Sequence, residues 1–182
     1  AANGQACTTM IDPNYKDYGY FKSELDTNTV AKLKNNIMKV IDRFQRQMFW
    51  TALWDMVRDG ELDVYSYTDL VLSNVTSEKD VLASIYGRWG EGALYYMPKD
   101  TPEQKAWATE YAAKVEKLMW AELHKAPAKT DRQKIWFDAF VNTAATPWAL
   151  QKIIQFLAGS NVPKGLTIDQ DRHRDLVFQM DK

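Results

Sequence analysis

Hydrophobic residues recur every three or four positions along most of the chain, which is the spacing of one face of an α-helix. The clearest stripe lies between Asp42 and Gly60. Two neighbouring rows form it, namely Phe44, Met48, Ala52 and Met56, and beside them Phe49, Leu53 and Val57. Asp42 can accept hydrogen bonds from a first turn, and Gly60 can end the helix because glycine adopts the left-handed conformation without a steric penalty. The pattern therefore predicts a long amphipathic helix here.

Similar start signals divide the rest of the chain. Thr101-Pro102-Glu103-Gln104 combines a capping residue, a proline at the first helical position and a glutamine that can reach back to the cap. Thr130 with Gln133 forms a second capping box of this kind. Further helices are expected to begin at Asp26 or Thr27, at Ser66 and Asp69, at Ser77 and Asp80, at Thr146-Pro147 and near Asp169. About eight helices with short loops and little strand signal predict an all-α fold.

The many aromatic residues fit this fold, because 7 Trp, 9 Tyr and 7 Phe fill gaps between packed helices. We expect the helix after Thr101 to bury Trp107, Ala108, Tyr111, Ala112, Val115, Leu118 and Met119. Two later helices should bury Leu150, Ile153, Ile154 and Leu157, and then Leu176, Val177 and Met180. Successive helical hairpins suggest a solenoid-like array of the HEAT or armadillo kind, with residues 1–26 as an irregular opening segment and 27–182 as one helical domain.

Charge and composition exclude several classes of partner. The formal net charge is −1, from 23 basic and 24 acidic residues, so nothing attracts nucleic acid or an anionic membrane over long range. No apolar run reaches the roughly 18 residues that span a bilayer. Cys7 is the one cysteine and cannot form a disulfide within the chain. The compartment stays open: a cytoplasmic location is slightly favoured, and an exported parent fits as well.

The sequence holds no self-contained catalytic site or cofactor motif. A helical zinc site usually needs two histidines four residues apart, but His124 and His173 are the two histidines of the chain and lie far apart in sequence. His124 sits at a predicted helix end, where the helix dipole alone favours it. No nucleophile elbow, phosphate-binding loop or dinucleotide fingerprint occurs. We therefore expect no catalytic, cofactor-binding or metal-binding residue in this chain.

Two charged clusters allow both a structural and a functional interpretation. Asp55, Asp59 and Glu61 with Arg58 can form a solvated face or a buried network after Gly60, and the solvated face is favoured. The basic run Arg172, His173 and Arg174 could bind a carboxylate or phosphate. It could equally pair with Asp169, Asp171 and Asp175 around it, and this pairing is favoured because the acids are at hand.

One stretch resembles a known family. The segment from Arg46 to Leu62, with Trp50 and then Leu53-Trp54-Asp55-Met56-Val57-Arg58-Asp59-Gly60-Glu61-Leu62, is similar to the C-terminal helical domain of M1-family zinc aminopeptidases. Upstream, Asp17-Tyr18-Gly19-Tyr20-Phe21 and Leu25-Asp26 resemble the beginning of that domain. Downstream, Gly165-Leu166 through Asp169, Asp171 and Arg172 resembles a later motif, although His173-Arg174 stands where the family tends to have Arg-Trp. The likeness covers roughly residues 12–177.

This resemblance implies a multidomain parent that removes N-terminal residues from peptides. In the family, a separate catalytic domain holds zinc through His-Glu-x-x-His and a distant Glu, and Gly-x-Met-Glu-Asn grips the substrate amine; none of these motifs occurs here. The implied role of this domain is to cap the active-site chamber and restrict access, with the catalytic domain and peptide substrates as partners. Arg172, His173 and Arg174 are the candidates for chamber contacts. The family domain also implies continuation beyond Lys182.

Two other interpretations stay open at this point. A stand-alone helical-repeat adaptor would bind proteins through an exposed aromatic groove. A helical nucleic-acid binder would need a basic face, which the balanced charge does not supply. A His-Glu-x-x-His motif upstream in the parent gene would favour the peptidase over the adaptor.

Overall fold

The all-α prediction is confirmed. The structure is a computed structural model that describes residues 10–77 and 94–181 of the 182-residue chain. Within these ranges lie seven α-helices of ten or more residues and no β-strand. No described helix is both long enough and apolar enough to cross a membrane. The chain divides into two compact units, Ala1–Ile85 and Tyr86–Lys182.

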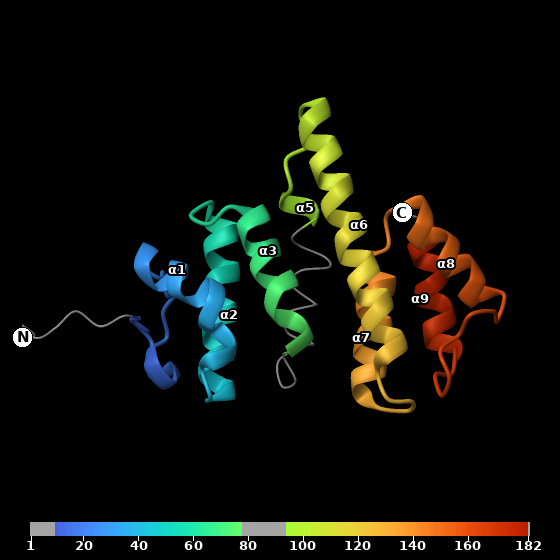
Figure 1. The fold of residues 1–182 in the computed structure, drawn as a ribbon, viewed down its shortest axis with the longest axis horizontal. Coiled ribbons are helices and arrows are strands. Elements are labelled where there is room, and N and C mark those ends of the chain that lie inside the picture. The colour runs from blue at the N-terminus through green and yellow to red at the C-terminus, as the bar shows by residue number, and fades with distance from the viewer. Residues whose placement is uncertain (1–9, 78–93, 182) are drawn as a thin grey trace, which may run out of the picture. The chain divides into compact units, whose positions relative to one another are not determined.

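The first unit is built around a pair of helices that lie side by side (Figure 1). Its elements are η1 (Tyr15–Asp17), α1 (Thr27–Asn36), η2 (Ile37–Lys39), α2 (Arg43–Asp59), α3 (Val64–Asn74) and η3 (Val75–Ser77). Helix α2 packs on α3 and also contacts η1 and η2. The most deeply buried large side chains of this unit are Leu33, Ile37, Trp50, Leu53 and Tyr67. An apolar core between α1, α2 and α3 therefore stabilises the unit.

The predicted boundaries of α2 are confirmed. The Asp42 carboxylate accepts hydrogen bonds from the N–H groups of Phe44 (2.8 Å) and Gln45 (3.3 Å). At the other end Gly60 is left-handed, with φ 79°, and the N–H of Glu61 donates to Met56 O at 2.9 Å. Phe44 belongs to the predicted apolar stripe, but 45% of it is exposed. Phe44 lies on the edge of the apolar face, in the same row as the half-buried Met48 and Thr51.

Helix α3 begins earlier than predicted. Asp63 caps it by accepting the Ser66 N–H at 2.8 Å, so Ser66 lies inside the first turn and is not the cap. Asp63 follows directly on the turn that ends α2, and the chain re-enters a helix at once. The Asp26 cap of α1 is confirmed, with hydrogen bonds from Asn28 N and Thr29 N. The helix predicted from Ser77 and Asp80 falls largely outside the described residues.

The second unit consists of two packed helical pairs, α6 with α7 and α8 with α9, and α9 also contacts α7 (Figure 1). Its elements are α5 (Leu94–Tyr96), α6 (Pro102–Lys125), α7 (Asp131–Thr143), α8 (Pro147–Leu157) and α9 (Gln170–Met180). The predicted caps are confirmed at Thr101, Thr130, Thr146 and Asp169. In the capping box before α7, however, the Gln133 side chain accepts from Lys129 N and does not reach Thr130 N.

Several predicted core positions of this unit are exposed. Trp107 is 54% exposed because α6 has 24 residues and its partner α7 only 13, so the first turns of α6 extend past the helix that covers the rest. Tyr111 and Leu118 are half-buried. On α9, Val177 and Met180 are exposed because the inward face carries Leu176 and Gln179. Ile154 of α8 is also exposed.

Candidate functional site

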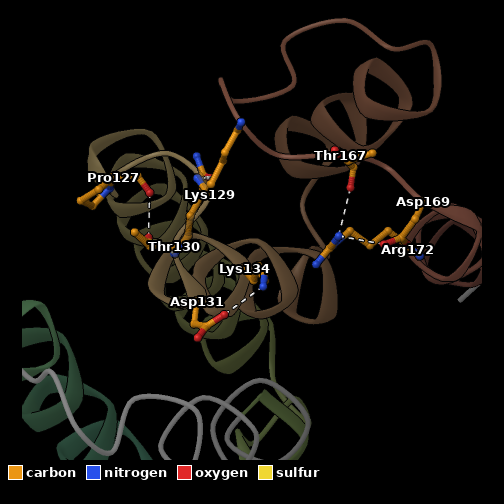
Figure 2. Close-up of polar contacts among 9 residues, drawn as sticks. Pro127, Lys129, Thr130, Asp131, Lys134, Thr167, Asp169 and Arg172 are labelled. Atoms are coloured by element: carbon orange, nitrogen blue, oxygen red, sulfur yellow. Dashed lines mark hydrogen bonds and ion pairs between the residues drawn. The ribbon is translucent and has the colours of Figure 1, made fainter.

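The predicted basic cluster lies at the first turn of α9, where the chain enters from the α8–α9 loop. Asp169 caps this helix by accepting the Arg172 N–H at 3.0 Å. The Arg172 guanidinium bends back and donates from one nitrogen to Thr167 O and to the Asp169 carboxylate, both at 3.0 Å (Figure 2). Its central carbon lies 5.8 Å from the centre of the Phe137 ring on α7. Arg172 therefore ties the loop, the start of α9 and α7 together.

His173 and Arg174 point elsewhere. Successive residues of an α-helix are about 100° apart, so three neighbours cannot face one site. Arg174 is exposed and pairs with Asp171 at 3.2 Å and Asp175 at 3.6 Å. His173 is exposed as well. The arginines thus pair with the nearby acids, as favoured from the sequence, and contact with substrate stays a prediction for all three residues.

Beside Arg172 lies a polar cavity of about 410 Å³ between α7 and the start of α9. Its lining residues are Phe137, Asp138, Val141, Asn142, Asp169, Asp171, Arg172 and Asp175. Desolvation raises the pKa of Asp138 above its ordinary value; the charge of Arg172 lowers that pKa, and the charges of Asp175 and Asp169 raise it again. The charged residues of the lining are four aspartates and Arg172. The aspartates would therefore repel an anion, such as a peptide carboxylate, that entered the cavity.

A zinc site does not fit the described residues. Nowhere in residues 10–77 and 94–181 do three His, Cys, Asp or Glu side chains gather closely enough to hold a metal ion. The Nδ1 atom of His124 lies 2.8 Å from Trp120 O, and its ring centre is 4.3 Å from that of Trp120. The His124 side chain therefore contacts its own helix, in the last turn of α6.

The acidic cluster near the end of α2 is a solvated face, as favoured from the sequence. Arg58, of which the side chain is 56% exposed, approaches Asp55 only to 3.6 Å. Asp59 pairs instead with Lys22 of the opening segment. Exposed pairs of this kind contribute little to stability.

The residues that carry the family resemblance have structural roles in the fold. Arg46 is buried and donates to the carbonyls of Val40 (2.7 Å) and Ile41 (3.0 Å), which fixes the turn before α2. Trp50 and Leu53 are core residues, and Gly60 ends the helix. The motif therefore specifies the packing of one helix, the turn before it and its C-terminal end.

Sequence reasoning missed three buried polar side chains that hold the second unit together. The Glu116 carboxylate, with 0% exposure, accepts the N–H groups of Ala145 (2.7 Å) and Thr146 (2.8 Å). Gln179 donates to Ala144 O at 2.6 Å, and Gln133 donates to Lys164 O at 3.1 Å. One signal was available: Glu116 follows Ala112 by four residues and so interrupts the apolar face of α6 with a charge.

Fold and site together define a helical scaffold whose polar clusters, in the described residues, join and cap helices. The chain belongs to the family of ERAP1-like C-terminal domains, whose pattern matches residues 11–180. It is also 30% identical over 173 residues to an aminopeptidase N of Streptomyces lividans. That similarity covers 92% of this chain and 19% of the relative, so the chain spans about a fifth of the length of that protein. The resemblance noted in the sequence is confirmed.

Proposed function

We propose that this chain is the non-catalytic C-terminal domain of an M1-type zinc aminopeptidase and that it caps the chamber in which peptides lose their N-terminal residues. The observation that carries the proposal is the family match over residues 11–180, joined to a named aminopeptidase relative. The described residues supply helices, caps and cores but no metal-binding cluster, which fits a wall better than a reaction centre. Zinc and catalytic groups would come from the preceding part of the parent.

The mechanism we propose is steric and electrostatic. Paired helices with buried polar ties, such as Glu116 between α6 and the start of α8, form a stiff surface that can exclude folded proteins. Exposed His173 and Arg174 on α9 would contact the peptide beyond the residue that is removed. Such contacts act on long substrates and not on single aminoacyl groups.

The catalytic assignment is tested with the isolated chain and the intact parent. We expect the parent to release p-nitroaniline from aminoacyl p-nitroanilides in a zinc-dependent reaction, and the 182-residue chain to release none. The parent gene should encode His-Glu-x-x-His before this region. Zinc-dependent turnover by the 182-residue chain alone would refute the proposal, and an independent reading frame without a peptidase domain would favour the adaptor.

The capping role is tested by the length dependence of the substrate. In the intact parent, Arg174→Ala and His173→Ala should raise KM for peptides of about ten residues and leave KM for an aminoacyl p-nitroanilide unchanged. Lys117→Ala, which removes an exposed charge on α6, serves as the control and should change neither value. Equal effects of all three variants on both substrates would contradict chamber contacts at α9.

A further inference from the structure

Among the described residues of the first unit, 10–77, the exposed large apolar side chains lie between positions 11 and 44. Seven large hydrophobic residues between positions 11 and 44 are exposed, and none between 45 and 77 is. They are Ile11, Tyr15, Tyr18, Tyr20, Phe21, Ile41 and Phe44. Scattered apolar residues are normal on a protein surface, but a concentration on one stretch indicates a surface that another molecule covers.

The turn at residues 14–19, which carries the exposed Tyr15 and Tyr18, is held by hydrogen bonds of one side chain. The buried Asn14 side chain donates to Asp17 Oδ1 (2.8 Å) and to Gly19 O (2.9 Å), and its own oxygen accepts the Gly19 N–H at 2.9 Å. Within this turn, Lys16 and Asp17 adopt left-handed conformations with φ 60° and 57°, which non-glycine residues rarely do. Three hydrogen bonds from one buried side chain thus hold a strained turn that presents Tyr15 and Tyr18 outward.

Next to this turn lies a groove of about 750 Å³ between the opening segment, α1, η2 and α2, which we call the opening groove. Phe49, Val40 and Met10 supply apolar lining, and Tyr15 forms part of one wall. A volume of this size accommodates several side chains of a bound segment. The groove and the exposed aromatic turn are continuous through Tyr15.

The charges around the opening groove select for an acidic occupant. Lys32 and Lys39 are lining residues, and neither makes an ion pair with any residue in the described part of the chain. The acid of the lining, Asp12, already accepts a hydrogen bond from the Gln45 amide. An incoming carboxylate would therefore meet two lysines whose charges are not balanced by an ion pair within the described residues.

We propose that the opening groove seats an apolar segment flanked by acidic side chains, contributed by the part of the parent polypeptide that lies outside these 182 residues. This inference rests on the proposed function, since it requires a larger parent. The chain matches 19% of its aminopeptidase relative, which leaves 81% of such a parent to supply the segment. A segment of the same polypeptide is held at a high effective concentration, so a groove of modest affinity stays filled.

The test uses the intact parent with a photo-crosslinking amino acid, p-benzoylphenylalanine, in place of Tyr15. We expect irradiation to join position 15 to a peptide of the same polypeptide outside residues 1–182, identified by mass spectrometry. The same amino acid in place of Ser66, an exposed residue of α3, is the matched control and should give at least about five-fold less of that product. Cross-links to a second copy, to added peptide substrate or within residues 1–182 would overturn the proposal.

Charge-reversal variants test whether the segment binds through the lysines of the opening groove or merely lies near position 15. Lys32→Glu with Lys39→Glu should lower the yield of the cross-link at least about five-fold, whereas Lys34→Glu, an exposed lysine of the same helix that does not line the groove, should leave it within about two-fold. Equal yields in both variants would overturn the acidic occupant. Turnover of an aminoacyl p-nitroanilide is measured on the same samples. Turnover without the cross-link would refute the groove proposal and leave the proposed function intact. The cross-link without turnover would support the binding of the segment in the groove and contradict the proposed function.

Discussion

The Glu116 side chain on α6 binds the two residues that precede α8, which lie 29 and 30 positions after it in the sequence. Its Oε1 atom accepts the Thr146 N–H at 2.8 Å and the Ala145 N–H at 2.7 Å, and its other oxygen accepts the Thr146 hydroxyl. Gln179 of α9 donates to the neighbouring Ala144 O at 2.6 Å. The α7–α8 linker is therefore held by side chains from α6 and α9, which give hydrogen-bond partners to backbone groups that no helix ladder satisfies.

Glu116→Ala should lower the free energy of unfolding by about 3 kcal/mol, because it removes charge-assisted hydrogen bonds and leaves two N–H groups without an acceptor. Glu116→Gln should cost about half as much, since its carbonyl oxygen can still accept both N–H groups and its amide can donate to Thr146 Oγ1. Urea titration measures the free energy, and amide hydrogen exchange at Thr146 reports on the cap itself.

The control for this cap is Glu110→Ala on the same helix. Glu110 is exposed and pairs with Lys114 at 2.7 Å, so its loss should change the free energy of unfolding by less than about 0.5 kcal/mol. If Glu110→Ala and Glu116→Ala destabilise the chain equally, the carboxylate of Glu116 does not have the structural role assigned to it.

The elements that could be predicted from the sequence are those set by short-range chemistry. The Asp42, Thr101, Thr146 and Asp169 caps each involve residues within three positions, so the local pattern contains all the information. The Glu116 cap joins residues 29 and 30 positions apart, and no local pattern specifies that distance. Exposure of Trp107 likewise depends on the relative lengths of α6 and α7, which the periodicity of α6 alone does not contain.

Gly165→Ala should be more destabilising than the same change at Gly159. Both glycines are left-handed, with φ 86° and 70°, so each alanine carries the same backbone penalty of about 1 kcal/mol. A Cβ at Gly165 would also lie 2.8 Å from Ala128 Cβ, whereas a Cβ at Gly159 meets nothing within 4 Å. We expect Gly165→Ala to cost about 2–3 kcal/mol in total.

Thermal unfolding of the two alanine variants measures this difference directly. Gly165 brings the α8–α9 loop against the loop before α7, where Gln133 also binds Lys164 O. A similar fall in Tm for both variants would show that the contact with Ala128 is not tight in solution.

Asp138→Asn should stabilise the chain at neutral pH. Desolvation raises the pKa of Asp138 above its ordinary value of 3.8. Between pH 3.8 and the raised pKa, the folded state therefore binds more protons than the unfolded state, and the free energy of unfolding falls as the pH rises through this range. The amide removes this cost, so the variant should be more stable than the original chain at pH 7 by less than about 1 kcal/mol. The gain should disappear below pH 3.8.

Asp131→Asn provides a control with the opposite sign. A hydrogen bond and the charge of Lys134 lower the pKa of Asp131, so its contribution to stability is present above the ordinary pKa and is lost as the pH falls through the lowered one. The variant should therefore be less stable at pH 7 and equal to the original chain in strong acid. Unfolding by urea at a series of pH values measures both differences, and the same pH dependence in both variants would contradict the assignment.

The candidate site could be predicted only in part. The run of Arg172, His173 and Arg174 identifies a charged corner, and the surrounding acids correctly indicate ion pairs. The sequence did not indicate that Arg172 turns back onto Phe137, because that contact depends on how α9 packs against α7. It also did not indicate the cavity beside Asp138, which lies 31 residues before Asp169 in the sequence.

Arg172→Ala should destabilise the second unit more than Arg174→Ala. Arg172 is mostly buried and loses two hydrogen bonds and its contact with the Phe137 ring, a cost of about 1–2 kcal/mol. Arg174 is exposed, so its removal should cost less than about 0.5 kcal/mol. Limited proteolysis of the α8–α9 loop, residues 158–169, measures the local effect, because the hydrogen bond from Arg172 to Thr167 O is one of the contacts that hold this loop. Cleavage there should be several-fold faster in Arg172→Ala and unchanged in Arg174→Ala. The cleavage rate of Arg172→Lys should fall between those of the two alanine variants, since a lysine keeps the positive charge but lacks the planar fork of donors that binds Thr167 O and Asp169. Equal cleavage rates in all three variants would mean that the loop is held by its other contacts, with Gln133 bound to Lys164 O as the first to examine.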